Sequence, residues 1–138
     1  MASDPMKLDS LLAALPDAAL ILDTQSDSVT AWNPAAAILL ARRMDAAPPR
    51  RFSRHLGPAF PRFLVFLGLV DYRGEGWSRE VDLRAEDGTE IRCEIRARIL
   101  PDQPGHVLLS LTDLDAFEHR TAMAETAAMH RAGINEWQ

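Results

Sequence analysis

The stretch that decides the fold runs from residue 81 to residue 99 and reads VDLRAEDGTEIRCEIRARI. Apolar and charged residues alternate on both sides of Asp87-Gly88, and a period of two is typical of strands with one buried and one wet face. A three-residue loop with Gly88 in the left-handed conformation joins the strands and pairs Leu83 with Ile91. The stretch therefore predicts a long β-hairpin.

The cross-strand charges favour this register of the hairpin. It places Asp82 opposite Arg92 and Arg84 opposite Glu90, whereas the other register of the same parity sets Arg84 against Arg92. Like charges that lie directly opposite one another destabilise a sheet. We therefore predict the first register.

Three shorter apolar segments complete the predicted sheet. Residues 18–22 and 29–32 flank the polar turn 23–28, which is rich in residues that hydrogen-bond their own backbone. Residues 107–111 form the fifth strand, with Val107, Leu109 and Leu111 on one face. The order of segments predicts an α+β fold: a five-stranded antiparallel sheet with helices packed on one face.

Helices are predicted before and after the first two strands. A cap helix begins at Pro5, with Asp4 as its N-cap, and ends at Pro16. Asn33 is the predicted N-cap of the next helix, because Pro34 suits the first helical position. The predicted buried face of that helix consists of Ile38, Leu39 and Leu40.

The rest of the chain gives three predictions about local structure. Residues 46–49 are a break with Pro48-Pro49, and the following stretch to Gly57 is expected to be irregular and exposed, with His55 solvated. Residues 58–70 are apolar on nearly all sides, which is typical of a helix buried between other elements. Asp115 and Glu118 have the spacing of a capping box, so the last helix is predicted to start at Asp115 and run to Ala132.

Length and composition limit the class of protein. The chain has 138 residues, of which 47% are hydrophobic and 25% charged, as in one soluble globular domain. A single cysteine cannot close a disulfide within the chain, and no apolar run is long enough for a membrane span. Since no export signal is visible, we expect a cytoplasmic protein without a membrane partner.

The charge distribution bears on macromolecular partners. The net charge of −5 argues against direct binding of nucleic acid. Arginines nevertheless gather in one segment that Pro48-Pro49 interrupts, and we interpret it first as a solvated loop and second as a surface for an acidic partner. These arginines are Arg42, Arg43, Arg50, Arg51, Arg54 and Arg62.

The order and spacing of these segments resemble the PAS family of sensory domains. The resemblance rests on LAALPDAALILD at 12–23, on AWNPAA at 31–36, and on EDGT at 86–89 with two long strands and LTDLD at 111–115. It covers about residues 8–115. The exit departs from the family's usual Asp, aliphatic residue and Thr, because Asp115 stands in the third position.

The resemblance implies a sensing, dimerising or relay module linked to an effector domain of a larger regulatory protein. Such modules precede histidine kinases, cyclic-dinucleotide enzymes or transcriptional activators, and we expect no enzyme activity from the chain itself. We divide it into a cap helix (1–16), a PAS-like core (17–114) and an exit helix (115–138). We expect a homodimer whose dimer and relay residues are Leu8, Leu11, Leu12, Leu15, Asp113, Asp115, Phe117 and Glu118.

The sequence assigns no cofactor. Residues 58–70 hold no histidine for an axial haem bond, and Cys93 lies on a strand, whereas covalent flavin photochemistry needs a cysteine on a helix. A noncovalent flavin or a small apolar ligand stays open, against the simpler interpretation that the aromatic residues fill the core. The candidate ligand residues are Trp32, Asn33, Phe63, Phe66, Trp77 and Arg79.

Two of these candidates have a structural alternative. Asn33 already serves as a helix cap, and Arg79 shares the parity of Val81 and Leu83, for which we favour a place near the sheet edge. The four histidines are scattered, so we predict no metal site and no catalytic group. A stand-alone domain that binds a small ligand and a ligand-free interaction module remain as alternatives to the sensor.

Overall fold

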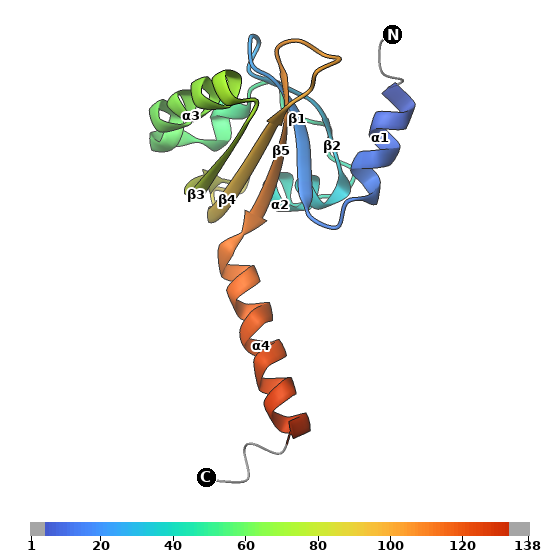
Figure 1. Cartoon of the computed structure of the whole chain (residues 1–138), viewed down its shortest axis with the longest axis vertical. Helices are drawn as coiled ribbons and strands as arrows, with labels where there is room; N and C mark the ends of the chain where they lie inside the picture. The colour runs from blue at the N-terminus through green and yellow to red at the C-terminus, as the bar shows by residue number, and fades with distance from the viewer. Residues whose placement is uncertain (1–4, 133–138) are drawn as a thin grey trace.

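A computed structural model describes residues 5–132 of the chain and the side chains of residues 10–129. Five strands form one sheet in the order β2-β1-β5-β4-β3, and every neighbouring pair is antiparallel (Figure 1). The elements are α1 (Pro5–Ala14), β1 (Ala18–Asp23), β2 (Ser28–Trp32), α2 (Pro34–Ala41), the 3-10 turns η1 (Phe52–His55) and η2 (Gly57–Ala59), α3 (Phe60–Arg73), β3 (Glu75–Arg84), β4 (Glu90–Ile99), β5 (His106–Asp113) and α4 (Leu114–Ala132). The predicted α+β fold is confirmed.

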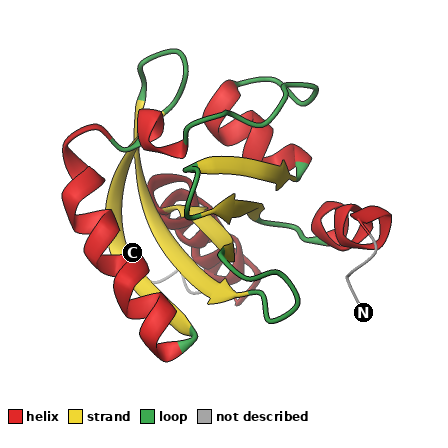
Figure 2. Ribbon diagram, turned by 90° about the horizontal axis from the view of Figure 1, so that it is seen from above, coloured by secondary structure: helices red, strands yellow, loops and turns green. Residues whose placement is uncertain are grey.

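The sheet separates two apolar clusters because successive strand residues point to opposite faces. Leu20 and Leu22 of β1 belong to the main core, which also takes in residues of α2, α3 and the 3-10 turns. Ala19 and Ile21 face the other way and pack with Leu12 of α1. Helix α1 therefore covers one part of the outer face, and it lies apart from the other helices in Figure 2.

The hairpin has the register that the charges predicted. Leu83 pairs with Ile91, and Arg84 pairs with Glu90. Gly88 has a φ of 88°, in the left-handed region where a side chain would be strained. The cross-strand charge pattern was therefore sufficient to fix this part of the sheet.

A bulge in β3 changes which side chains at the start of this strand face the core. Ser78 pairs with Ile95 and Val81 with Cys93, so two residues of β3, Arg79 and Glu80, lie opposite one residue of β4. The extra residue interrupts the alternation of inward and outward side chains. Residues before the bulge therefore point to the opposite face from the one that a regular strand would give them. As a result, Ser78 faces inward with Val81.

Two predictions about the burial of helices were wrong. Ile38 is 46% exposed, because α2 turns its alanines and Leu40 toward the sheet. Helix α3 buries only Phe63 and Val70 fully, since it packs on the sheet along one side and leaves the other side open. Its exposed apolar side chains are Phe60, Leu64, Val65, Leu69 and Tyr72.

The stretch from Arg50 to Gly57 contains the turn η1 and is partly buried, whereas we predicted it to be irregular and exposed. The Asp27 carboxylate accepts hydrogen bonds from the Ser53 backbone N–H (3.2 Å) and hydroxyl (2.5 Å), which ties the segment to the β1–β2 turn. Phe52 and Leu56 fill the core. His55 is only 4% exposed, and its Nδ1–H donates to the Arg84 carbonyl oxygen at 2.7 Å, so it is not a solvated histidine.

Candidate functional site

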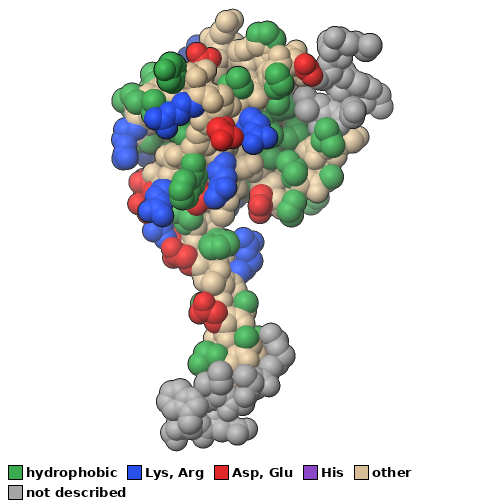
Figure 3. Space-filling view, viewed as in Figure 1, with side chains coloured by type: hydrophobic (Ala, Val, Ile, Leu, Met, Phe, Trp, Pro, Cys, Tyr) green, Lys and Arg blue, Asp and Glu red, His purple; other side chains and the backbone are tan. Residues whose placement is uncertain are grey.

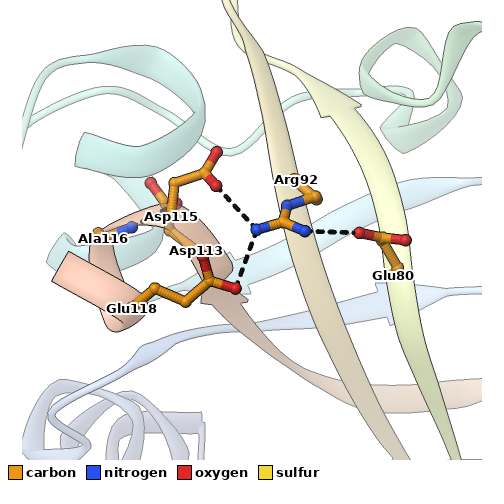
Figure 4. Close-up of polar contacts among 6 residues, drawn as sticks. All are labelled: Glu80, Arg92, Asp113, Asp115, Ala116 and Glu118. Atoms are coloured by element: carbon orange, nitrogen blue, oxygen red, sulfur yellow. Dashed lines mark hydrogen bonds and ion pairs between the residues drawn. The ribbon is translucent and has the colours of Figure 1, made fainter. Parts of the chain in front are cut away.

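The last helix leaves the sheet with a side-chain cap that differs from the predicted one. Asp113, at the end of β5, accepts a hydrogen bond from the Ala116 backbone N–H at 3.1 Å (Figure 4). The helix begins at Leu114, one residue before the predicted start. The capping box of Asp115 and Glu118 was therefore wrong, because an acceptor two residues earlier already satisfies the first turn.

Asp115 and Glu118 instead bind one arginine of the sheet. The Arg92 guanidinium of β4 donates to the Asp115 carboxylate at 2.9 Å and to the Glu118 carboxylate at 3.0 Å. It also donates to Glu80 of β3 at 2.8 Å (Figure 4). We call these four residues the Arg92 junction. It joins two strands to the first turn of α4.

The electrostatics of the Arg92 junction keep its arginine charged. The hydrogen bond to Glu80, then the one to Asp115, raise the pKa of Arg92 further above its usual value. The arginine side chain is 35% exposed and its partners are more open still, so water and salt screen these contacts. Each contact of the junction is therefore individually weak, and water can replace it.

Helix α4 makes little use of the rest of the domain. It projects away from the sheet (Figure 1), and all its side chains from Asp115 to Met129 are exposed. Phe117 is 50% exposed, and a shallow hollow at the base of the helix takes in Phe117, Thr121 and Ala124. A single helix of this length is marginal in water, so this surface suits a partner.

The leucines predicted for the dimer interface separate into two groups. Leu12 is buried against the outer face of the sheet, whereas Leu11 and Leu15 are 56% and 42% exposed. Leu8 lies in α1, but its side chain falls outside the described ones. Two of the four leucines are thus available to a second molecule.

The buried side-chain amide of Asn33 makes four hydrogen bonds with the backbone. Its Oδ1 accepts from the Ala19 and Ala36 backbone N–H groups at 3.0 and 2.9 Å. Its Nδ2 donates to the Leu12 and Asp17 carbonyl oxygens at 3.0 and 2.8 Å. The predicted N-cap of α2 is confirmed, and the same amide leaves no bond to spare for a ligand.

The other candidate ligand residues come together only in part. Phe63, Phe66 and Trp77 line a hollow of about 370 Å³ between α3 and β3, the volume of a small-molecule site. Trp32 lies elsewhere and donates its indole N–H to the Ala46 carbonyl oxygen at 3.0 Å. Arg79 is exposed on the edge strand β3, which confirms the edge position, and its guanidinium lies over Trp77.

The hollow between α3 and β3 has an apolar floor and a charged rim. Leu56 and Val81 contribute to the floor, and the rim includes Glu80, the β3 member of the Arg92 junction. The space below the centre of the sheet is filled by core side chains, including Phe52 and Phe63, whose ring centroids are 5.4 Å apart. Sequence reasoning missed Glu80, because the bulge that brings it to the junction has no sequence signal that we recognised.

Cys93 is buried in the core and faces inward, as predicted from its parity. Burial, followed by the nearby Asp113 and Asp82 carboxylates, raises the pKa of its thiol to about 12. The thiol therefore stays protonated at neutral pH and is a poor nucleophile. Among the described residues there is no cluster of His, Cys, Asp and Glu that could hold a metal ion.

The architecture is an antiparallel sheet with its first strand beside its last, short helices on one face, and a helix that leaves from the central strand. The chain has the PAS fold, and the resemblance seen in the sequence is confirmed. No family model matches the sequence. None of the helices in the described range is both long and apolar enough to cross a membrane.

One curated relative and two solved structures document this likeness. The sensory histidine kinase/phosphatase NtrB of Rhodobacter capsulatus is 27% identical over 125 residues, which cover 89% of this chain and 35% of the relative. The chain thus spans about a third of that protein's length. The PAS domain of a Colwellia psychrerythraea protein superposes with a TM-score of 0.63 at 17% identity, covering 80% of this chain and 97% of that one. The PAS domain of nitrogen regulation protein NR(II) from Vibrio parahaemolyticus has a TM-score of 0.54 at 20% identity, covering 77% and 96%.

Proposed function

We propose that the chain is the sensor and dimerisation module of a cytoplasmic signalling protein and that it relays a signal through α4 to a covalently linked effector. The Arg92 junction carries this proposal, because it is the set of side chains that joins the hairpin to the exit helix. The likeness to a sensory histidine kinase/phosphatase supports an effector of that class. The domain itself does no catalysis in this proposal.

The partner of α4 in this proposal is a second copy of the chain. Phe117, Thr121, Ala124 and Ala128 recur at alternating spacings of four and three, which is the seam of a parallel helix pair. Alanines let two helices approach closely but bury little area, so the seam alone is weak. The exposed Leu11 of α1 and Leu15, which directly follows α1, supply further apolar area to the same dimer.

The relay works through release and recapture of α4. When Arg92 holds both carboxylates of the first turn, the helix direction is fixed relative to β4. A change at Glu80, on the rim of the hollow beside α3, weakens one side of the junction and lets the helix turn against its twin. The relay thus begins at Glu80 of the edge strand β3 and ends at the first turn of α4.

Intersubunit distances on α4 test the relay. Cys93 is buried, so Ala122→Cys, an exposed position of α4 outside the seam, adds one accessible thiol for a spin label. We expect a narrow intersubunit distance distribution, which broadens in Arg92→Gln and is unchanged in Arg96→Gln, the control on the same strand. A monomer at all concentrations, or equal distributions in the three proteins, would contradict the proposal.

A second function, binding of a small apolar ligand, is favoured by the hollow between α3 and β3. Its volume of about 370 Å³ and its aromatic residues suit a compact ligand. Absorption spectra of the purified chain, and mass spectrometry before and after denaturation, test for a flavin or another copurified molecule. We expect a bound small molecule that Phe66→Ala loses; a colourless, ligand-free protein would favour relay without a ligand.

A further inference from the structure

A second surface lies on the outer face of the hairpin, away from the Arg92 junction. Helix α1 covers Ala19 and Ile21 of β1, but none of the described helices covers the outer face at the start of β3. Trp77 is 50% exposed there. A tryptophan has a large apolar ring with one polar N–H group, which makes an exposed one a suitable contact for a partner.

Two arginines hold Trp77 in a defined arrangement. The guanidinium carbons of Arg79 and Arg96 each lie 5.2 Å from the centroid of its ring, within the range of a cation–π contact. Arg96 is the cross-strand partner of Trp77, and the bulge places Arg79 beside it. Tryptophan and arginine are the residues that most often dominate the binding energy of protein interfaces.

The surface beside Trp77 is concave and positively charged. A hollow of about 600 Å³ is lined by Trp77 and Leu108 and by arginines from α3 and β4. We call the Trp77 patch the group of Arg73, Trp77, Arg79, Arg96, Arg98 and Leu108. Figure 3 shows Lys and Arg side chains gathered on the part of the molecule that carries α3, β3 and β4.

The charges of the Trp77 patch are only partly neutralised. Arg98 pairs with Glu75 at 3.2 Å and Arg96 with Glu94 at 3.1 Å. Within the described part of the chain, Arg73 and Arg79 form no ion pair. The patch therefore has a positive surplus on a chain whose net charge is −5.

Charge complementarity selects the occupant. A second copy placed symmetrically on this face would set the arginines of one patch against those of the other, which is repulsive. Nucleic acid is disfavoured because, in the described chain, only Arg73 and Arg79 of the patch lack an ion pair, and affinity for nucleic acid depends on the number of phosphates neutralised. We propose that the Trp77 patch binds an acidic segment of a partner protein, with carboxylates on Arg73 and Arg79 and an apolar side chain on Trp77.

A synthetic peptide provides the probe for this proposal. We would titrate the chain calorimetrically with a blocked peptide of alternating Glu and Leu, and with the same peptide carrying Gln in place of Glu. The variants are Arg73→Gln/Arg79→Gln, Trp77→Phe, and the control Arg43→Gln/Arg50→Gln, whose arginines are exposed outside the patch. Thermal unfolding confirms that each variant is folded.

We expect the Glu peptide to bind and the Gln peptide to bind at least roughly tenfold more weakly, since the contacts are charge-assisted. Arg73→Gln/Arg79→Gln should weaken binding by about tenfold or more, Trp77→Phe by less, and the control by under about twofold. Equal binding of both peptides, or an equal loss in the control, overturns the proposal. So does tighter binding of duplex DNA through the same arginines, or self-association that this double variant abolishes.

Discussion

Asn33 and Arg92 are two polar residues that each join several separate parts of the fold, and they differ in their exposure to water. Asn33 is 2% exposed and makes four hydrogen bonds with α1, β1, α2 and the α1–β1 loop. Arg92 is 35% exposed and binds carboxylates of β3 and α4. A buried amide cannot exchange its partners for water, whereas an exposed guanidinium can.

In the proposed relay, this difference separates a rigid part of the domain from a part that can move. Around Asn33, any lost contact leaves a buried N–H or C=O group without a partner, so opening costs the fold itself. Around Arg92, a lost contact is replaced by solvent. We therefore expect the contacts of Asn33 with α1 to open only when the domain unfolds, and the contacts of Arg92 with α4 to open separately.

Removal of the buried amide should have the largest effect on stability. In Asn33→Ala, the cap of α2 and the ties to β1 and α1 disappear together, and we expect a loss of roughly 3 kcal/mol or more. Urea unfolding followed by circular dichroism measures this change. Asn33→Ser keeps an oxygen for the Ala36 N–H, so its stability should lie between those of Asn33→Ala and the wild type. Equal stability of Asn33→Ala and the wild type would contradict the claim that the Asn33 contacts are part of the fold.

Two glycines of the α3–β3 unit should respond in opposite directions. A Cβ on Gly76 would lie 2.7 Å from Val70 Cγ2 and 3.0 Å from Phe66 Cε1, so Gly76→Ala should destabilise the domain by about 1–3 kcal/mol. Gly68 of α3 faces open space, and Gly68→Ala should stabilise by about 0.5–1 kcal/mol. Thermal unfolding measures both, and a stabilising Gly76→Ala would show that α3 and β3 are not packed as described.

The cap of α4 should have a smaller and more local effect. Asp113→Ala removes the acceptor of the Ala116 N–H, and we expect a loss of about 1 kcal/mol at the start of the helix. Hydrogen exchange of the first-turn amides measures it. Asp113→Asn keeps an acceptor and serves as the control; if Asp115→Ala weakened the first turn as much as Asp113→Ala, Asp113 would not be the cap.

Where side chains interact with close neighbours in a regular pattern, the sequence was a good guide. The alternation around Asp87-Gly88 and the opposed charges of Arg84 and Glu90 were enough for the hairpin register. The dipeptide Asn33-Pro34 predicted the start of α2, because its cap is local. Its bonds to α1 and β1 were not predictable, since they depend on tertiary contacts.

The candidate site was less accessible to sequence reasoning. The bulge between Ser78 and Val81 brings Glu80 to Arg92 and turns Trp77 outward, and it is decided by the packing of β3 and α3. The spacing of Asp115 and Glu118 fits both a capping box and two ligands of one arginine. Only the position of Asp113 in the structure distinguishes these two roles.

Hydrogen exchange in Arg92→Gln tests the central claim most directly. The substitution removes the charge that joins β3 and β4 to α4 and leaves the cap at Asp113 intact. We predict exchange at least severalfold faster in the first two turns of α4, with unchanged protection in β1 and in α2 around Asn33. Unchanged exchange in α4, or a uniform loss of protection across the domain, would contradict the claim that Arg92 holds the helix as a separable unit.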